Sequence, residues 1–191
     1  MTDMTKTPYS EQREAQTTVD ELTLRMIEFD KGDAKRIQHF LKVHRFAQFI
    51  GRAEHLEPHA LFVLECAAVL HDIGIHPAEA KYGNCNGKLQ EQEGPVQARY
   101  MLERMRFDTA DIDRICWLIA HHHTYTDIKD LDYQILVEAD FLVNAYEDNL
   151  SEHAVLAMMK NIFRTETGRK LGKLMFLEKY DPSQQPDAAT M

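Results

Sequence analysis

Two histidines and two aspartates occupy positions in apolar segments where a charged or strongly polar side chain is costly. His71 and Asp72 end the apolar run 62–70. His44 falls on the predicted inward stripe of the preceding segment, and Asp140 lies inside another apolar run. Since a buried carboxylate without a partner is strongly destabilising, each aspartate needs a counter-charge. A divalent cation held jointly by these four side chains would supply it.

Each of these residues also has a simpler structural explanation. Asp72 can pair with an arginine or cap a helix, and the two histidines can form hydrogen bonds in the core. The four explain one another better as one site, because facing helices of a bundle can bring nitrogen and oxygen ligands to one ion. Such a set accepts manganese, iron, cobalt, nickel or zinc, and the sequence does not choose between them. We expect one divalent transition-metal ion, and a second ion is an open alternative.

The elements that must position these residues are all predicted to be helices. Apolar residues recur at helical spacing through most of the chain, and no segment shows the sustained alternation of a strand. Asp33 is a suitable N-cap, and Pro58 suits the first turn of a helix. The predicted helices cover approximately 33–55, 59–73, 92–105, 108–123, 132–143, 151–163 and 168–179. The sequence therefore predicts an all-α, single-domain bundle of about six to eight helices.

The domain limits follow from length and composition. The chain has 191 residues, which suffices for one hydrophobic core and is short for two. Residues 1–18 and 181–191 are polar and are expected to form flexible tails. Residues 19–180 are expected to form one domain.

The charge balance and the cysteines bound the partners and the compartment. Acidic side chains outnumber basic ones by 31 to 22, which disfavours general binding of nucleic acids or anionic membranes. There is no apolar signal core at the N-terminus and no run of 18 apolar residues, so we expect a cytoplasmic protein without a membrane span. Cys66 and Cys116 are expected in the core and Cys85 in a polar loop, without a disulfide framework.

The order of the four candidate ligands resembles the H…HD…D signature of the HD-domain superfamily of metal-dependent phosphohydrolases. The resemblance covers roughly residues 33–169 and includes Val43-His44-Arg45, Leu70-His71-Asp72-Ile73-Gly74 and Glu138-Ala139-Asp140-Phe141-Leu142-Val143. It implies an HD-domain helical bundle, and usually a phosphatase or phosphodiesterase activity on nucleotides or other phosphate esters. A minority of the superfamily are di-iron oxygenases.

The expected function is therefore hydrolysis of a small phosphorylated metabolite or nucleotide by a metal-activated water. Asp72 is the residue best placed to orient this water or to bridge to a second ion. Two alternatives stay open: an HD-type di-iron oxygenase, and a non-catalytic regulatory module with a vestigial metal site. The sequence leaves the substrate, the metal and the oligomeric state undetermined.

A second metal depends on the histidine run 121–123, which ends an apolar segment. Related two-metal members carry histidines in the corresponding place, and His122 is the first choice here, before its two neighbours. Such members also have a histidine between the HD pair and this run, but this sequence has none between His76 and His121. Glu93 stands near that place and is a candidate metal ligand, general base or hydrogen-bond acceptor for a metal ligand. It equally suits the acidic first turn of a helix.

An anionic substrate also needs basic or polar side chains at the site. Arg45 follows the first candidate ligand, and Asn144 lies one helical turn after Asp140. Arg164 and Lys170 belong to a local basic cluster in an otherwise acidic chain. These residues are candidates for substrate binding, although such a cluster is also typical of a solvated helix face.

Overall fold

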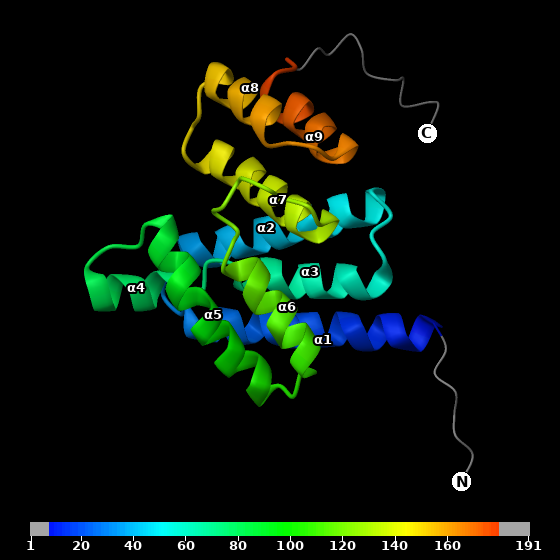
Figure 1. Ribbon diagram of the computed structural model, residues 1–191, viewed down its shortest axis with the longest axis vertical. Coiled ribbons are helices and arrows are strands. Elements are labelled where there is room, and N and C mark those ends of the chain that lie inside the picture. The colour runs from blue at the N-terminus through cyan, green and yellow to red at the C-terminus, as the bar shows by residue number, and fades with distance from the viewer. Residues whose placement is uncertain (1–7, 180–191) are drawn as a thin grey trace.

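The computed structural model describes residues 8–179, which form nine helices and no strand within that range (Figure 1). In chain order they are α1 (Pro8–Phe29), α2 (Ala34–Ala53), α3 (Pro58–Leu70), α4 (Ile75–Tyr82), α5 (Gly87–Arg104), α6 (Thr109–Ile119), α7 (Leu131–Glu147), α8 (Glu152–Asn161) and α9 (Glu166–Phe176). The predicted all-α bundle is thereby confirmed.

Helix α3 lies at the centre of the bundle and packs against α1, α2, α6 and α7. Eight consecutive residues, 63–70, are buried, which explains why this helix is apolar on nearly all sides. The helices α1, α3, α2 and α7 follow one another across the molecule, and the α8–α9 pair lies beyond α7 (Figure 1). Helices α4, α5 and α6 cover one side of this stack (Figure 1).

One stretch, Pro58–Tyr82, is long and apolar enough to cross a membrane by length and composition alone. It takes in α3, the turn at residues 71–74 and α4. In its most apolar window 67% of the residues are buried inside the protein. The central position of α3 accounts for this apolar character, because a core helix passes the same test as a membrane span.

Two of the helices were not expected from the sequence. Helix α1 begins at Pro8, so residues 8–18 of the expected N-terminal tail are helical. The sequence did not reveal this helix because its first half is polar. Its buried apolar residues begin only at Val19 and continue with Leu22 and Met26. Helix α4 begins just after Gly74, and Pro77 lies in its first turn, where a missing N–H costs no hydrogen bond. Residues 1–7 and the expected C-terminal tail lie outside the described residues.

The chain passes very closely to itself just after the HD pair. A Cβ atom on Gly74 would lie only 2.5 Å from the backbone nitrogen of Gly94, so residue 74 must be glycine for the start of α4 to meet α5 this closely. Helix α5 also begins earlier than predicted, after the N-cap Asn86, whose side chain accepts a hydrogen bond from the N–H of Leu89. The close approach of Gly74 to Gly94 fixes the direction in which the chain leaves Asp72.

Several local predictions are confirmed. The Asp33 side chain caps α2 by accepting from the N–H of Arg36 at 3.1 Å, and Pro58 is the first residue of α3. Cys66 and Cys116 are buried in the core. These features depend on short-range geometry, which the sequence displays directly.

Candidate metal centre

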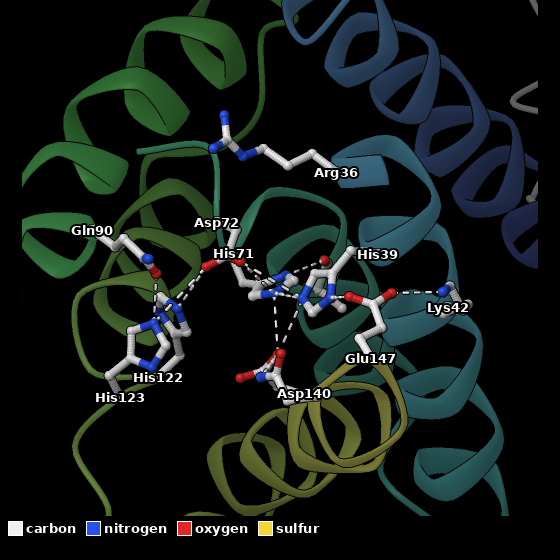
Figure 2. A network of polar contacts seen from close by, with 12 residues as sticks. Arg36, His39, Lys42, His71, Asp72, Gln90, His122, His123, Asp140 and Glu147 are labelled. Carbon is white, nitrogen blue, oxygen red and sulfur yellow. Dashed lines mark hydrogen bonds and ion pairs between the residues drawn. The ribbon is translucent and has the colours of Figure 1, made fainter. Parts of the chain in front are cut away.

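Four polar side chains from three parts of the fold converge in the core (Figure 2). His39 comes from the second turn of α2, His71 and Asp72 follow the last residue of α3, and Asp140 lies in the middle of α7. His39, His71 and Asp140 are at most 7% exposed. Their donor atoms all lie within 4.8 Å of one another, as expected for a ligand group.

The spacing of these atoms fits coordination of one ion. Nε2 of His39 lies 3.1 Å from Nε2 of His71 and 3.2 Å from Oδ1 of Asp140. Oδ2 of Asp72 lies 3.6 Å from Nε2 of both histidines. Two ligand atoms about 2.1 Å from one metal are about 3.0 Å apart at a right angle and about 3.4 Å apart at the tetrahedral angle. Each of the two histidines therefore lies at a ligand-to-ligand distance from the other histidine and from both carboxylates, as expected around a common cation.

The outer nitrogens of the histidines are all engaged, which leaves Nε2 free to face inward. Nδ1 of His71 donates to the carbonyl of Ala68 at 2.9 Å, and Nδ1 of His122 donates to the carbonyl of Ile119 at 2.7 Å. Both histidines follow a helix end, where the last carbonyls lack helical partners and can accept such bonds. Nδ1 of His39 lies 3.0 Å from a carboxylate oxygen of Glu147. A histidine whose Nδ1 carries the proton presents a lone pair on Nε2, as a metal ligand must.

The carboxylates of Asp72 and Asp140 must be balanced by positive charge within the cluster. Burial lowers the pKa of His39, but the hydrogen bond to Asp140 and the charges of Asp140 and Asp72 outweigh it and raise this pKa to about 9. Burial raises the pKa of Asp72, yet His71 and His122 lower it to about 2. The pKa of Asp140 is likewise held far below its ordinary value, against burial, by its contacts with His39 and His71. Protons on the histidines and a divalent cation are alternative ways to balance the two carboxylates.

A second ligand group shares Asp72. Its Oδ1 atom, on the side away from the first group, lies 3.1 Å from Nε2 of His122 and 3.9 Å from Nε2 of His123. Nε2 of His123, however, lies 2.6 Å from Oε1 of Gln90, whose amide group donates to the carbonyl of Cys85. His123 therefore donates its Nε2 proton to Gln90, so this nitrogen has no lone pair available for a metal. The second group is for this reason less suited to bind a metal than the first.

The structure does not bring His44 into the cluster, and His39 stands there in its place. Nε2 of His44 instead lies 3.0 Å from Oε2 of Glu65. The predicted inward stripe of α2 was wrong, since His44 is only partly buried while His39 and Val43 lie on the buried face. Helix periodicity does contain this signal, because His39 and Val43 are four residues apart and share a face.

Glu93 also lies apart from both ligand groups. Its Oε1 atom accepts from Nζ of Lys81 at 2.9 Å and from the hydroxyl of Tyr82 at 2.8 Å. These contacts, with Lys81 first, hold the pKa of Glu93 below its ordinary value. Lys81 and Tyr82 belong to α4, which the sequence did not predict. The α5 residues that contact His123 are Gln90 and Glu91, not Glu93.

The candidate substrate residues fall into two sets. Nδ2 of Asn144 donates to Oδ1 of Asp140 at 2.9 Å and so lies beside the metal centre, while its predicted contact with substrate stays a prediction. Arg45 is exposed and donates to Oε1 of Gln48. Arg164 and Lys170 line a surface cavity of about 550 Å³ that shares no residue with the cluster. The guanidinium of Arg164 is engaged by the carbonyls of its own turn.

Two comparisons with known proteins gave a match. The family model for the HD domain matches residues 36–159, which is more than half of the chain and contains the whole cluster. The chain belongs to the HD-domain family. The structure is also similar to that of a predicted HD superfamily hydrolase from an uncultured Thermotogales bacterium, with 28% sequence identity and a TM-score of 0.53. That match covers 84% of this chain and 82% of the other, and no curated protein matches the chain.

Membership of the HD-domain family gives the cluster a chemical meaning. The family match and the similar HD superfamily hydrolase support metal-dependent hydrolase chemistry for this family. The inward Nε2 atoms, the two carboxylates and their spacing are the features of this chain that fit such a metal. Sequence reasoning found His71, Asp72, Asp140 and His122 but missed His39, Gln90 and Glu147, all of which lie in the network of Figure 2.

Proposed function

We propose that this protein is a metal-dependent phosphohydrolase that acts on a small phosphorylated metabolite or nucleotide. His39, His71, Asp72 and Asp140 would hold the ion. The observation that carries the proposal is the convergence of Nε2 of two buried histidines and oxygens of two carboxylates at distances of 3.1–3.6 Å. A bound divalent cation would supply Lewis acidity toward a phosphoryl oxygen and would lower the pKa of a water.

The residues of the chain have separate roles in this proposal. Asp72 uses its two oxygens on opposite sides, with Oδ2 toward His39 and His71 and Oδ1 toward His122. It is therefore placed to accept a proton from, and to orient, an attacking water between the two groups. Asn144 holds Oδ1 of Asp140 and fixes the direction of that carboxylate.

Arg36 is the basic residue we propose for substrate binding in place of Arg45, Arg164 and Lys170. It lies one helical turn before His39 on α2, and its side chain extends near the site (Figure 2). Its guanidinium is partly exposed and currently binds Glu79 at 2.7 Å. A planar guanidinium suits bidentate recognition of a phosphate, which would compete with this ion pair.

The test is a metal and activity measurement on one preparation. Purified protein is analysed for bound metal, stripped with a chelator and reloaded with manganese, cobalt, nickel, iron or zinc. Each form is then assayed against phosphomonoesters and phosphodiesters, including nucleotides. We expect metal-dependent hydrolysis of a phosphate ester that Asp140→Ala abolishes and that Glu93→Gln, remote from the cluster, retains. Reloaded protein that binds metal but leaves the whole panel intact would contradict the hydrolase.

The second ligand group favours one other candidate function, a di-iron oxygenase on the same scaffold. Asp72, His122 and His123 are the residues that would hold the additional ion. Oxygen consumption by iron-loaded protein, with no hydrolysis of any phosphomonoester or phosphodiester under any metal, would support this candidate over the hydrolase. The hydrolase should act equally well without oxygen.

A further inference from the structure

Glu147 joins the metal centre to a lysine on the outside of the bundle. Its Oε2 atom lies 3.0 Å from Nδ1 of His39, and its Oε1 atom accepts from Nζ of Lys42 at 2.6 Å (Figure 2). Glu147 is the last residue of α7, seven residues after Asp140, and so lies two helical turns along the same face. Lys42 is three residues after His39 on α2, one turn along its helix.

This contact distinguishes His39 from the other inward-facing histidines. His71 and His122 donate their Nδ1 protons to neutral backbone carbonyls, whereas His39 donates to a carboxylate. A charged acceptor binds the Nδ1 proton more strongly and makes the imidazole a better electron donor at Nε2. It also opposes rotation of the ring, because a flipped ring would lose the contact. His39 needs such support because it lies inside a helix, without a free carbonyl at a helix end.

Lys42 completes the arrangement by fixing the carboxylate. Glu147 is largely buried, with 13% of its side chain exposed, while Lys42 is 37% exposed. Burial raises the pKa of Glu147, but the contacts with Lys42 and His39 lower it below its ordinary value, so the carboxylate stays charged. Without Lys42 this charge would be less well compensated and free to move away from His39.

We propose that Glu147 and Lys42 are positioning residues that hold His39 with Nε2 toward Asp140 and His71 and thereby raise the affinity of the centre for its cation. The inference rests on the proposed metal centre and does not depend on the substrate. It assigns a role to two residues that lie outside the ligand set. Neither residue contacts the reacting atoms.

The test measures metal affinity separately from folding. Metal-free wild type, Glu147→Gln, Glu147→Ala and Lys42→Met are titrated with Co²⁺ and with Mn²⁺ by calorimetry, and the Co²⁺ absorption spectrum is recorded. We expect the dissociation constant to rise roughly 10-fold to 100-fold for Glu147→Ala. A smaller rise is expected for Glu147→Gln, which keeps a neutral acceptor for Nδ1, and for Lys42→Met. The Co²⁺ spectrum should change when His39 is no longer held.

Asp132→Asn is the matched control. It removes another buried carboxylate of α7, one that binds Arg114 at 2.6 Å and does not contact the cluster. We expect it to lower the unfolding temperature of the metal-free protein without changing metal affinity or the Co²⁺ spectrum. If Glu147→Ala does not fold, Glu147→Gln and the more exposed Lys42→Met carry the same comparison.

Three outcomes would overturn the inference. Wild-type affinity in the Glu147 variants would show that the carboxylate does not support His39. An equal loss in Asp132→Asn would assign the effect to general destabilisation of α7. Wild-type protein that binds neither ion would overturn the metal centre itself, and the proposed function with it. Metal binding that depends on Glu147 in a protein without phosphohydrolase activity would support the inference and contradict only the function.

Discussion

Asp30 provides a test of how burial affects stability in this fold. It follows α1, is 2% exposed, and its Oδ2 atom has no hydrogen-bond partner within the described residues. Its Oδ1 atom lies 3.2 Å from Nε2 of His76. Burial raises the pKa of Asp30 from 3.8 to about 6, against the opposing effects of His76 and Arg36. We therefore predict that Asp30→Asn stabilises the protein, and that the gain grows with pH.

The magnitude follows from proton linkage. The folded carboxyl, with its higher pKa, binds more protons than the unfolded one between pH 4 and 6, so wild-type stability falls as the pH rises through this window. A difference of about two pKa units corresponds to about 3 kcal/mol of lost stability above pH 6. At pH 4.5 the same relation gives a loss of about 1 kcal/mol, and the loss disappears well below the unfolded pKa of 3.8. The advantage of the asparagine variant should thus grow by about 2 kcal/mol between pH 4.5 and pH 7.5.

The assay is urea unfolding of metal-free protein at these two pH values. Asp113→Asn is the control, because its carboxylate is 60% exposed and pairs with Arg99 at the surface. Asp30→Asn should gain stability relative to wild type from the lower to the higher pH, and Asp113→Asn should change little. An advantage of Asp30→Asn that stays constant or shrinks as pH rises would refute the reasoning, since it would mean that Asp30 is charged at no cost in the folded state.

Three further predictions concern the site and its supports. His39→Ala should abolish tight Co²⁺ binding measured by calorimetry, whereas His44→Ala should keep it. His44→Ala should instead lower the free energy of unfolding in urea by about 2 kcal/mol, because it breaks the contact with Glu65. The reverse pattern would show that His44 is the metal ligand, as the sequence predicted. Gly74→Ala should cost about 2–3 kcal/mol in the same unfolding assay, because its Cβ would meet backbone, and an unchanged midpoint would contradict this close approach. Gln90→Ala should strengthen binding of a second Co²⁺ ion roughly fivefold by releasing the Nε2 proton of His123, so an unchanged or weaker second binding step would count against the blocking role of Gln90.

The sequence was informative wherever the deciding interaction is local. The helix starts at Asp33 and Pro58 depend on residues within one turn. The significance of Asp72 and Asp140 followed from a general cost, because a carboxylate within a buried apolar segment needs compensation in any fold. Helix α1 was missed because its first half is polar, and helix α4 because it is short, begins just after Gly74 and contains Pro77. The two helices pack on α3 and α5, respectively.

What the sequence by itself determined is the all-α class, the buried acidic positions and the histidines at the ends of two apolar helices. Only the tertiary structure decided between His39 and His44, because five residues correspond to a rotation of about 140° around a helix and packing of α2 on α3 and α7 sets which side faces inward. It also placed Glu93 against Lys81 and Gln90 against His123. These pairings join residues 12 and 33 positions apart, and their geometry depends on how α4, α5 and the turn after α6 meet, which no local pattern encodes.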